Sequence, residues 1–324
     1  MSFKSSIFFI LLLGLLCSCW AVDPRDICPV AQLLTPCFCQ KHFETGRAIV
    51  RCEKISSNDI ILEVLNKTND YEYESLFVDL SSLTYIPSNI FEIKKLSSLY
   101  IFSSTMISLF DKPPNATFLE VLFLHELKLT RTIQWDLFAG FPNLKELYIE
   151  NSRARNLDQT FRDNVAKTLT KLTLKNCSID KFDDQIFASL DNLVEINLED
   201  NKVKEPKRSM FSSPSKLEKI NLKNNQIKYL PEDIFSGMDN LRHIWLSNNL
   251  IAGLNENTLK TPFQKLRSFL VDGNPIKCDC SLKWITRVDR ENSFWNNFIG
   301  QCATPKSRQG KALNDLKETD FPNC

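Results

Sequence analysis

Residues 217–227, LEKINLKNNQI, decide the fold, because residues 241–251 repeat their pattern as LRHIWLSNNLI. Both stretches follow L-x-x-L-x-L-x-x-N-x-L, with other aliphatic residues allowed at the leucine positions. The template fits nine times in tandem, and the first copy has tyrosine in place of leucine. The copies start at Tyr73, Leu96, Leu119, Leu144, Leu169, Leu193, Leu217, Leu241 and Leu266. Successive starts are 23 to 25 residues apart, and a period of this length predicts a solenoid of stacked repeats.

The L-x-L segment of each copy is expected to be a short strand whose alternate side chains point into the solenoid. Stacked copies then form one curved parallel sheet on a concave face. The asparagine position turns the chain inward, and its amide can hydrogen-bond backbone groups of neighbouring turns. The C-terminal half has Asn201, Asn225, Asn249 and Asn274 there, whereas the N-terminal half has Ser81, Ser104, Leu127, Ser152 and Cys177. The sequence therefore predicts less regular stacking in the N-terminal half.

The chain contains 23 phenylalanines, and the repeats explain many of them. One phenylalanine recurs at the same position after the strand in several copies, on the convex side. These residues are Phe91, Phe138, Phe161, Phe187, Phe211 and Phe235. A row at one repeat position indicates core packing, and not a cofactor site.

The first 21 residues are typical of a secretory signal peptide. Lys4 supplies the positive charge, residues 7–16 are apolar, and small residues precede a cleavage point after Ala21. The alternative, a membrane anchor, needs about 20 apolar residues, so this run is too short. No later stretch is long and apolar enough to span a bilayer. We therefore expect a secreted, extracellular protein without a membrane anchor.

Cleavage would leave nine cysteines, and eight of them form two clusters at the ends of the repeat region. The clusters consist of Cys28, Cys37, Cys39 and Cys52, and of Cys278, Cys280, Cys302 and Cys324. In an exported chain such clusters indicate disulfides. Zinc is the alternative, but C-x-C is a poorer zinc spacing than C-x-x-C. Spacing alone leaves the pairing open, since four cysteines allow three pairings.

The complete pattern resembles extracellular leucine-rich repeat proteins with cysteine-rich N- and C-terminal caps. The resemblance rests on Cys28-Pro29 and Cys37-Phe38-Cys39 in front, and on residues 274–280, NPIKCDC, with Cys302-Ala303-Thr304-Pro305 behind. The chain is also similar to the non-catalytic subunit of decapod shrimp luciferase and its arthropod relatives. The family pairing implies the disulfides Cys28–Cys39, Cys37–Cys52, Cys278–Cys302 and Cys280–Cys324.

These observations predict an α/β-type leucine-rich repeat solenoid with disulfide-bonded caps. The concave face should be a curved parallel sheet, and the convex face mostly irregular with short helices. The expected organisation is a signal peptide (1–21), an N-terminal cap (22–72), about nine repeats (73–274) and a C-terminal cap (275–324).

Partners of such a scaffold are expected on the concave face, at strand positions that point away from the core. Four consecutive copies have an aromatic residue there: Phe77, Tyr100, Phe123 and Tyr148. Phe102 faces the same way, and His243 with Trp245 forms a smaller second candidate. Outward aromatic residues are typical anchors of binding surfaces. The alternative is cross-strand packing that only stabilises the sheet. On the middle strands the flanking positions alternate between Glu and Lys, which predicts a largely self-neutralised surface.

Composition and motifs argue against other functions. A net charge of +1 is unlike the basic excess of nucleic-acid-binding proteins. No hydrolase, zinc-protease or nucleotide-binding motif is present, so we expect no enzyme, cofactor or metal. The predicted function is recognition of an extracellular protein or glycan. The alternatives are an accessory subunit that binds a catalytic subunit, and an enzyme with an unrecognised site.

Two further features concern modification. The sequons at Asn66, Asn115 and Asn176 predict glycosylation, and the last of them lies where a glycan would hinder a partner. Cys177, the ninth cysteine, is expected to be a small buried residue in the asparagine column, with an intermolecular disulfide as the alternative.

Overall fold

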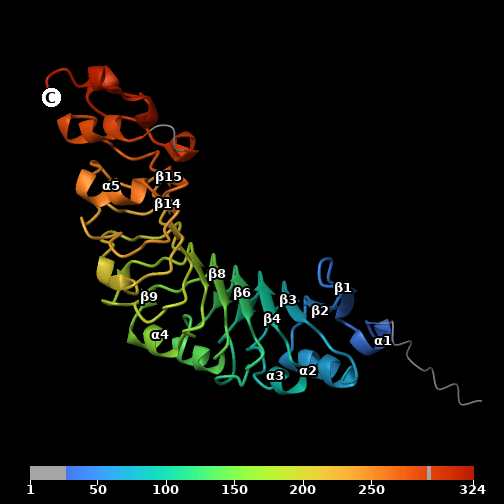
Figure 1. Ribbon diagram of the computed structural model, residues 1–324. Helices are drawn as coiled ribbons and strands as arrows, with labels where there is room; N and C mark the ends of the chain where they lie inside the picture. Colours follow the sequence, from blue (N-terminus) through green and yellow to red (C-terminus); the bar gives the residue numbers. More distant parts are fainter. Residues whose placement is uncertain (1–26, 290–292) are drawn as a thin grey trace, which may run out of the picture.

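The computed structural model describes residues 27–289 and 293–324, so the predicted signal peptide lies outside the described residues. The chain forms an arc (Figure 1). One large sheet lines its inner side, and short helices lie on its outer side. The outer helices are α2 (Asn58–Lys67), α3 (Ile90–Ile93), α4 (Gln159–Asn164) and α5 (Glu256–Phe263), while α1 (Ala31–Leu34) lies at the N-terminal end of the arc. The predicted architecture, a curved sheet with a mostly irregular convex side, is confirmed.

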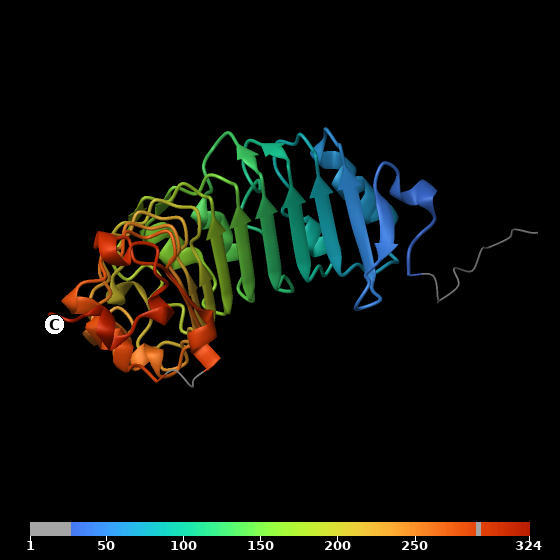
Figure 2. The same ribbon diagram turned by 90° about the horizontal axis from the view of Figure 1, so that it is seen from above.

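Within the described residues, twelve strands form the large sheet in the order β1-β2-β3-β4-β6-β8-β10-β12-β13-β14-β15-β16. Their bounds are β1 (Phe38–Lys41), β2 (Ala48–Glu53), β3 (Ser75–Asp79), β4 (Ser98–Phe102), β6 (Val121–His125), β8 (Glu146–Glu150), β10 (Lys171–Lys175), β12 (Glu195–Asn197), β13 (Lys219–Asn221), β14 (His243–Trp245), β15 (Ser268–Leu270) and β16 (Phe298–Ile299). β1 runs antiparallel to β2, and the later strands are parallel to one another (Figure 2). The nine strands from β3 to β15 lie at the nine L-x-L segments that the sequence predicts.

Smaller elements follow the strands on the way to the convex side. Two further pairs of strands are parallel: β5 (Thr105–Met106) with β7 (Lys128–Leu129), and β9 (Asn156–Leu157) with β11 (Lys181–Phe182). Short 3-10 helices supply other turns. They are Trp135–Gly140, Arg208–Met210, Cys280–Arg287, Ser293–Asn297, Lys306–Arg308, Leu313–Asp315 and Glu318–Asp320.

The core runs through the whole solenoid between the sheet and the convex side. The strand leucines point into it: Leu76, Leu99 and Leu122 lie side by side in register and are fully buried. The predicted convex phenylalanines are buried as well, and their rings touch along the arc. Phe161 contacts Phe187, which in turn contacts Phe211. The interpretation of this row as core packing is confirmed.

The asparagine ladder of the C-terminal half works as predicted. Asn225 is buried, and its Nδ2 donates to the backbone oxygens of Leu198, Leu222 and Lys223 at 2.9–3.1 Å. Its Oδ1 accepts from the N–H of Val203 at 2.9 Å. One side chain thus satisfies polar backbone groups of two adjacent repeats, which would otherwise be buried without partners.

The prediction of less regular stacking in the N-terminal half is wrong. From β3 to β10 each pair of neighbouring strands is in register over five residues, whereas from β10 to β15 each pair is in register over three. In the N-terminal half a serine hydroxyl takes over the acceptor role that Oδ1 of asparagine has in the C-terminal half. The hydroxyl of Ser104 accepts from the N–H of Ser81 at 3.0 Å, and that of Ser152 accepts from Leu127 at 2.9 Å. One hydroxyl acceptor holds the turn in these serine repeats, and the repeat with Leu127 stacks without a side-chain acceptor at this position.

In successive repeats one residue shortly after the strand has a left-handed backbone conformation, with positive φ. These residues form a column along the solenoid that was not expected from the sequence. The backbone N–H of such a residue donates to the next repeat, as Leu80 does to Phe102 and Asn151 to Lys175. All of them have φ between 44° and 70°. The column comprises Lys54, Leu80, Ser103, Glu126, Asn151, Asn176, Asp200, Asn224, Asn248 and Gly273. Asparagine, aspartate and glycine tolerate this conformation, and a bulky residue such as leucine is strained in it.

Leu80→Asn is therefore expected to stabilise the protein by about 1 kcal/mol. Leu80 has φ 50° and its side chain is 53% exposed, so little packing is lost. The urea midpoint of unfolding measures the effect. Leu80→Ala is the control, because it removes the same exposed apolar surface and leaves the backbone strain. Equal gains in both variants would contradict the proposed cause.

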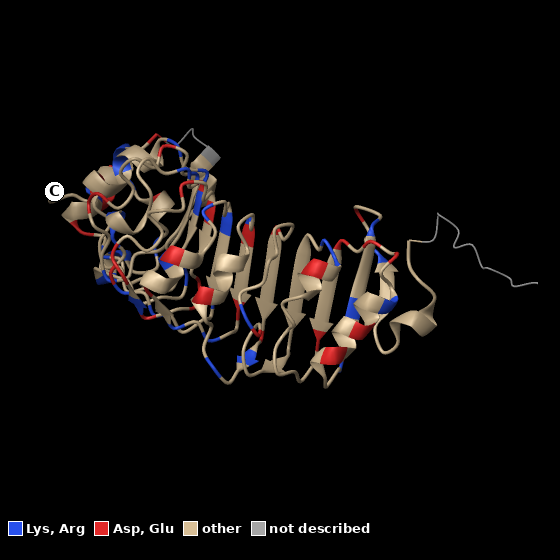
Figure 3. Ribbon diagram, turned by 90° about the horizontal axis from the view of Figure 1, so that it is seen from below, with Lys and Arg blue, Asp and Glu red and all other residues tan. Residues whose placement is uncertain are grey.

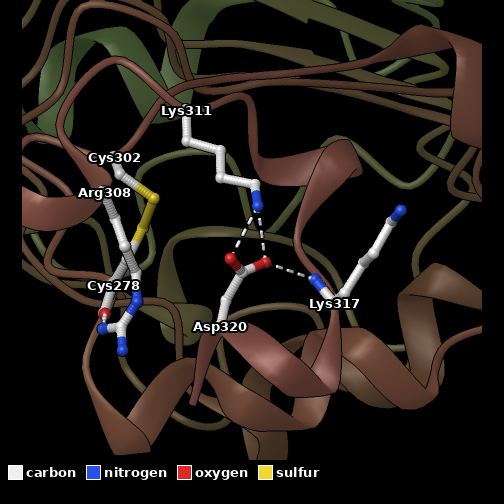
Figure 4. The surroundings of a disulfide bond; sticks show 6 residues. All are labelled: Cys278, Cys302, Arg308, Lys311, Lys317 and Asp320. Carbon is white, nitrogen blue, oxygen red and sulfur yellow. Dashed lines mark hydrogen bonds and ion pairs between the residues drawn. A yellow bond between two sulfur atoms is a disulfide. The ribbon is translucent and has the colours of Figure 1, made fainter. Parts of the chain in front are cut away.

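Both ends of the described chain carry disulfides, in the four pairs that the resemblance implies. Cys28 pairs with Cys39 and Cys37 with Cys52 in front. The rear pairs are Cys278–Cys302 and Cys280–Cys324. Around the rear bonds, Lys311 donates to both oxygens of Asp320 at 2.6 and 2.7 Å (Figure 4). Arg308 donates to the carbonyl oxygen of Cys278, so this region is held by polar contacts in addition to the disulfides.

Candidate partner-binding site on the concave face

The five aromatic residues predicted near the N-terminal end lie on four adjacent strands. The register places Phe77 of β3 beside Tyr100 of β4, and Phe123 of β6 beside Tyr148 of β8. Tyr100 and Phe123 are also neighbours, so the four rings form one uninterrupted row. Phe102 lies two residues beyond Tyr100 on β4 and faces the same way.

The rings contact one another along and across the row. Phe77 and Tyr100 are stacked, with their centroids 4.3 Å apart and a tilt of 10°. Phe123 lies 5.3 Å from Tyr148 and 5.4 Å from Phe102. Such aromatic pairs contribute about 0.5–1.5 kcal/mol each beyond the area that they bury. We call Phe77, Tyr100, Phe102, Phe123 and Tyr148 the aromatic cluster.

All five rings are half-buried. Cross-strand packing therefore accounts for part of their burial, while the remaining surface still points away from the core. The two interpretations of the sequence, packing and binding, are compatible in this geometry. A partner would meet a preformed apolar surface that loses little entropy on binding, because its side chains already hold one another in place.

Two polar residues, His125 and Arg51, lie beside the aromatic cluster, and the sequence analysis did not predict either of them there. The ring of His125 lies 6.2 Å from that of Phe102 and 6.4 Å from that of Phe123. Arg51 of β2 pairs in register with Phe77, and its guanidinium carbon lies 4.9 Å from the centre of that ring. The alternation in Val50-Arg51-Cys52 signals an outward Arg51, but only the docking of β2 onto β3 shows which residue it meets.

A carboxylate fixes the far end of the row. The hydroxyl of Tyr148 donates to Glu146 at 2.6 Å, and Lys171 donates to the other carboxylate oxygen at 2.9 Å. Burial raises the pKa of Tyr148 well above its usual range, and the bond to Glu146 adds to the effect. The pKa of Glu146 is lowered, because its hydrogen bonds to Tyr148 and Lys171 outweigh its desolvation. Tyr148 therefore remains a protonated donor held in a single orientation.

The middle of the face is charged and largely self-neutralised, as predicted. Lys171 pairs with Glu146 at 2.9 Å, Lys175 with Glu199 at 3.5 Å, and Lys219 with Glu195 at 3.9 Å. These partly exposed pairs contribute only about 0–1 kcal/mol each. They separate the aromatic cluster from the second candidate patch.

That second patch is a small hydrogen-bonded unit on β14 and β15. Nε1 of Trp245 donates to the hydroxyl of Ser268 at 2.9 Å, and Nδ1 of His243 lies 2.8 Å from the same oxygen. Desolvation lowers the pKa of His243, and the charges of Lys219 and Arg267 add to it. Nδ1 of a neutral imidazole can accept a hydrogen bond from the hydroxyl of Ser268. Lys219 also lies over the Trp245 ring, 4.3 Å from its centre, so this indole is less available than the aromatic cluster.

The modification candidates have distinct surroundings. Asn66 lies exposed near the end of α2, and Asn115 lies exposed in an irregular segment. Asn176 is exposed directly after β10, and its Nδ2 donates to Oδ1 of Asn151 at 2.9 Å. Cys177 is buried and free of any disulfide, and burial raises the pKa of its thiol to about 12. Glycosylation at all three sequons stays a prediction.

No group of three or more histidines, cysteines, aspartates or glutamates among the described residues is arranged to hold a metal ion. No described helix has the length and apolar character needed to cross a membrane. The histidines on the face, His125 and His243, lie five strands apart in the sheet.

Comparison with known proteins completes the assignment of the fold. The family model described as "Leucine rich repeat" matches residues 167–227 and 215–276. The matched residues include β12 to β15 and the asparagine ladder. The chain is a leucine-rich repeat solenoid.

Several curated proteins match parts of this solenoid. The human leucine-rich repeat and immunoglobulin-like domain-containing nogo receptor-interacting protein 1 is 38% identical over 58 residues, which are 18% of this chain and 9% of that protein. Mouse leucine-rich repeat and immunoglobulin-like domain-containing nogo receptor-interacting protein 3 is 46% identical over 52 residues, which are 15% of this chain and 8% of that protein. Mouse leucine-rich repeat and fibronectin type-III domain-containing protein 2 is 33% identical over 61 residues, 19% and 7% of the two chains. The matches thus span less than a tenth of each relative.

Proposed function

We propose that this protein is a secreted, non-enzymatic recognition protein that binds an extracellular protein through its aromatic cluster. The contact of five outward-facing rings on adjacent strands carries the proposal. Large aromatic residues that stay at a surface are the usual anchors of protein interfaces. The neutralised charges beside them offer no comparable anchor.

The stacking of the rings favours a protein partner over a glycan. Sugars pack their C–H groups on the open face of an aromatic ring. Phe77 and Tyr100 cover one face of each other at 4.3 Å, and Arg51 lies over the ring of Phe77, so that ring offers its edge to a partner. Ring edges suit the aliphatic and aromatic side chains of a protein, which bind rings in edge-to-face geometry.

The relatives support a protein partner as well. One of them is named for its interaction with a receptor, and both kinds of relative combine leucine-rich repeats with another extracellular-type domain in their names. The four disulfides of this chain support an oxidising compartment, in which such bonds persist.

The test is affinity capture from the native extracellular fluid, with three baits. They are the mature chain, a Tyr100→Ala/Phe123→Ala variant, and an Ile107→Ala/Phe118→Ala control. The control removes two apolar side chains that are 45% and 53% exposed outside the concave strands. We expect one stoichiometric protein with the wild type and the control. The concave variant should bind it at least about 30-fold more weakly, since anchors contribute about 2 kcal/mol or more each.

Equal capture by all three folded baits would contradict the proposal and make the cluster a purely structural feature. Far-UV circular dichroism and the melting temperature establish that each bait is folded. A captured enzyme would identify the chain as the accessory subunit of a complex, which is the alternative that the sequence suggests.

A further inference from the structure

One flank of the solenoid is strongly basic, although the whole chain carries a net charge of only +1. It consists of the segments that follow the left-handed column in five successive repeats, and we call it the basic flank. The segments are KLTR (128–131), RARN (153–156), SIDK (178–181), KVKE (202–205) and QIKY (226–229). They contain eight lysines and arginines against two acidic residues, Asp180 and Glu205.

The basic flank has sharp limits along the solenoid. The equivalent segments of the two preceding repeats, SLTY (82–85) and TMIS (105–108), carry no charge, and neither does LIAG (250–253) in the following repeat. Figure 3 shows basic residues at the edge at which the strands end in the middle of the molecule, and basic and acidic residues interspersed in the C-terminal part. The charge is therefore concentrated on five neighbouring repeats, about 19 Å at the spacing of adjacent strands.

The side chains of the flank point outward from a rigid support. Ala154 is buried between Arg153 and Arg155, and Val203 is buried between Lys202 and Lys204. Backbone bonds join the segments to one another: the N–H of Ala154 donates to Cys177, and that of Lys202 to Ile179. The cations are thus held in a row by the same stacking that builds the solenoid.

Few of these charges are neutralised within the protein. All eight basic side chains are exposed. Arg155 forms an ion pair with Asp180 at 2.7 Å. The other seven have no ion pair with any residue that the structure describes. Their arrangement differs from that of the concave lysines, which face carboxylates on the next strand.

We propose that the basic flank binds a linear sulfated polysaccharide. A single small anion could meet only the cations of one or two repeats, whereas a polyanion can follow all five. Arginine and lysine form strong charge-assisted hydrogen bonds with oxyanions, and release of counterions adds affinity over the whole row. The disulfides fit the extracellular location proposed above, and sulfated polysaccharides are linear polyanions found there.

Single-stranded nucleic acid is a less suitable ligand for this surface. Proteins that bind it combine cations with several aromatic platforms on which successive bases stack. Within the five segments Tyr229 is the only aromatic residue. The aromatic cluster lies on the strands themselves, whereas the flank lies in the segments that follow them, and only KLTR and RARN belong to repeats that carry a ring of the cluster.

The test compares an Arg153→Glu/Lys202→Glu/Lys204→Glu variant with a Lys112→Glu/Lys167→Glu/Lys317→Glu control. Both change the net charge by the same amount, and the control residues are exposed and lie outside the flank. Binding of each full mature chain to heparin, to chemically desulfated heparin and to single-stranded DNA is measured at several salt concentrations. We expect the flank variant to bind heparin at least about tenfold more weakly than the wild type, with a shallower salt dependence. The control should keep most of the affinity.

Three results would overturn the proposal: no binding of wild type to heparin, an equal loss in both variants, or equal affinity for desulfated heparin or DNA. The test is independent of the proposed protein recognition. The flank variant should still capture the protein partner, and the Tyr100→Ala/Phe123→Ala variant should still bind heparin.

Discussion

Phe161→Ala is expected to lower the free energy of unfolding by about 3–5 kcal/mol, the usual cost of removing a buried phenylalanine ring. Phe161 lies in α4 and is fully buried. Its ring is 4.8 Å from that of Trp135 and 5.9 Å from that of Phe187, in edge-to-face geometry with both. Because each repeat packs only on its neighbours, a cavity here interrupts the convex core between two repeats.

Urea unfolding followed by far-UV circular dichroism measures this loss. Phe118→Ala is the matched control, since it removes the same ring from a site that is 53% exposed and should cost no more than about 0.5 kcal/mol. Similar losses in the two variants would contradict the view that the convex phenylalanines form the core. A broadened transition for Phe161→Ala would show that the repeats on its two sides unfold separately.

Cys280→Ser/Cys324→Ser is the second change with a large expected effect. The bond closes a loop with a sequence separation of 44 residues, so its loss should cost about 4 kcal/mol through the entropy of the unfolded chain. It also ties the last residue of the chain to the start of the Cys280–Arg287 helix. Without it the rear region should open and uncover Phe263 and Phe298, whose rings lie 5.6 Å apart in the core.

Limited proteolysis with mass spectrometry measures the opening, and chemical unfolding measures the cost. Cys28→Ser/Cys39→Ser provides the comparison, because its loop has a separation of 11 residues and should contribute about 3 kcal/mol. Cleavage confined to the rear region is expected for the first variant. Protection of that region at the wild-type level would show that the Lys311–Asp320 ion pair and the aromatic packing hold it without the disulfide.

The repeat template predicts the strands well for a physical reason. Once Ile220 and Leu222 must both reach the core, Asn221 between them has to face the opposite side of the sheet. The same register predicts that Phe77 lies beside Tyr100, as it does in the sheet. Cysteine spacing locates the end regions in the same way, although only family resemblance suggests the pairs.

Features that depend on backbone conformation could not be predicted from this single sequence. The left-handed column includes Leu80, Ser103 and Glu126, which carry no common signal for positive φ. The regular stacking of the N-terminal half was missed because Ser104 and Ser152 look weaker than asparagine, while their hydroxyls accept the one bond that the turn needs. The position of Arg51 over Phe77 depends on how β2 meets the first repeat.

The free thiol of Cys177 can report local opening of the solenoid through its reaction with a thiol reagent. The residue is fully buried near the middle of the repeat array, where the serine acceptors of the N-terminal half give way to asparagines. A pKa of about 12 leaves almost no thiolate at neutral pH, so a thiol reagent reacts only when the array opens at this position. The labelling rate of the native chain therefore distinguishes fraying from the ends, which would leave Cys177 protected, from a split between the two halves.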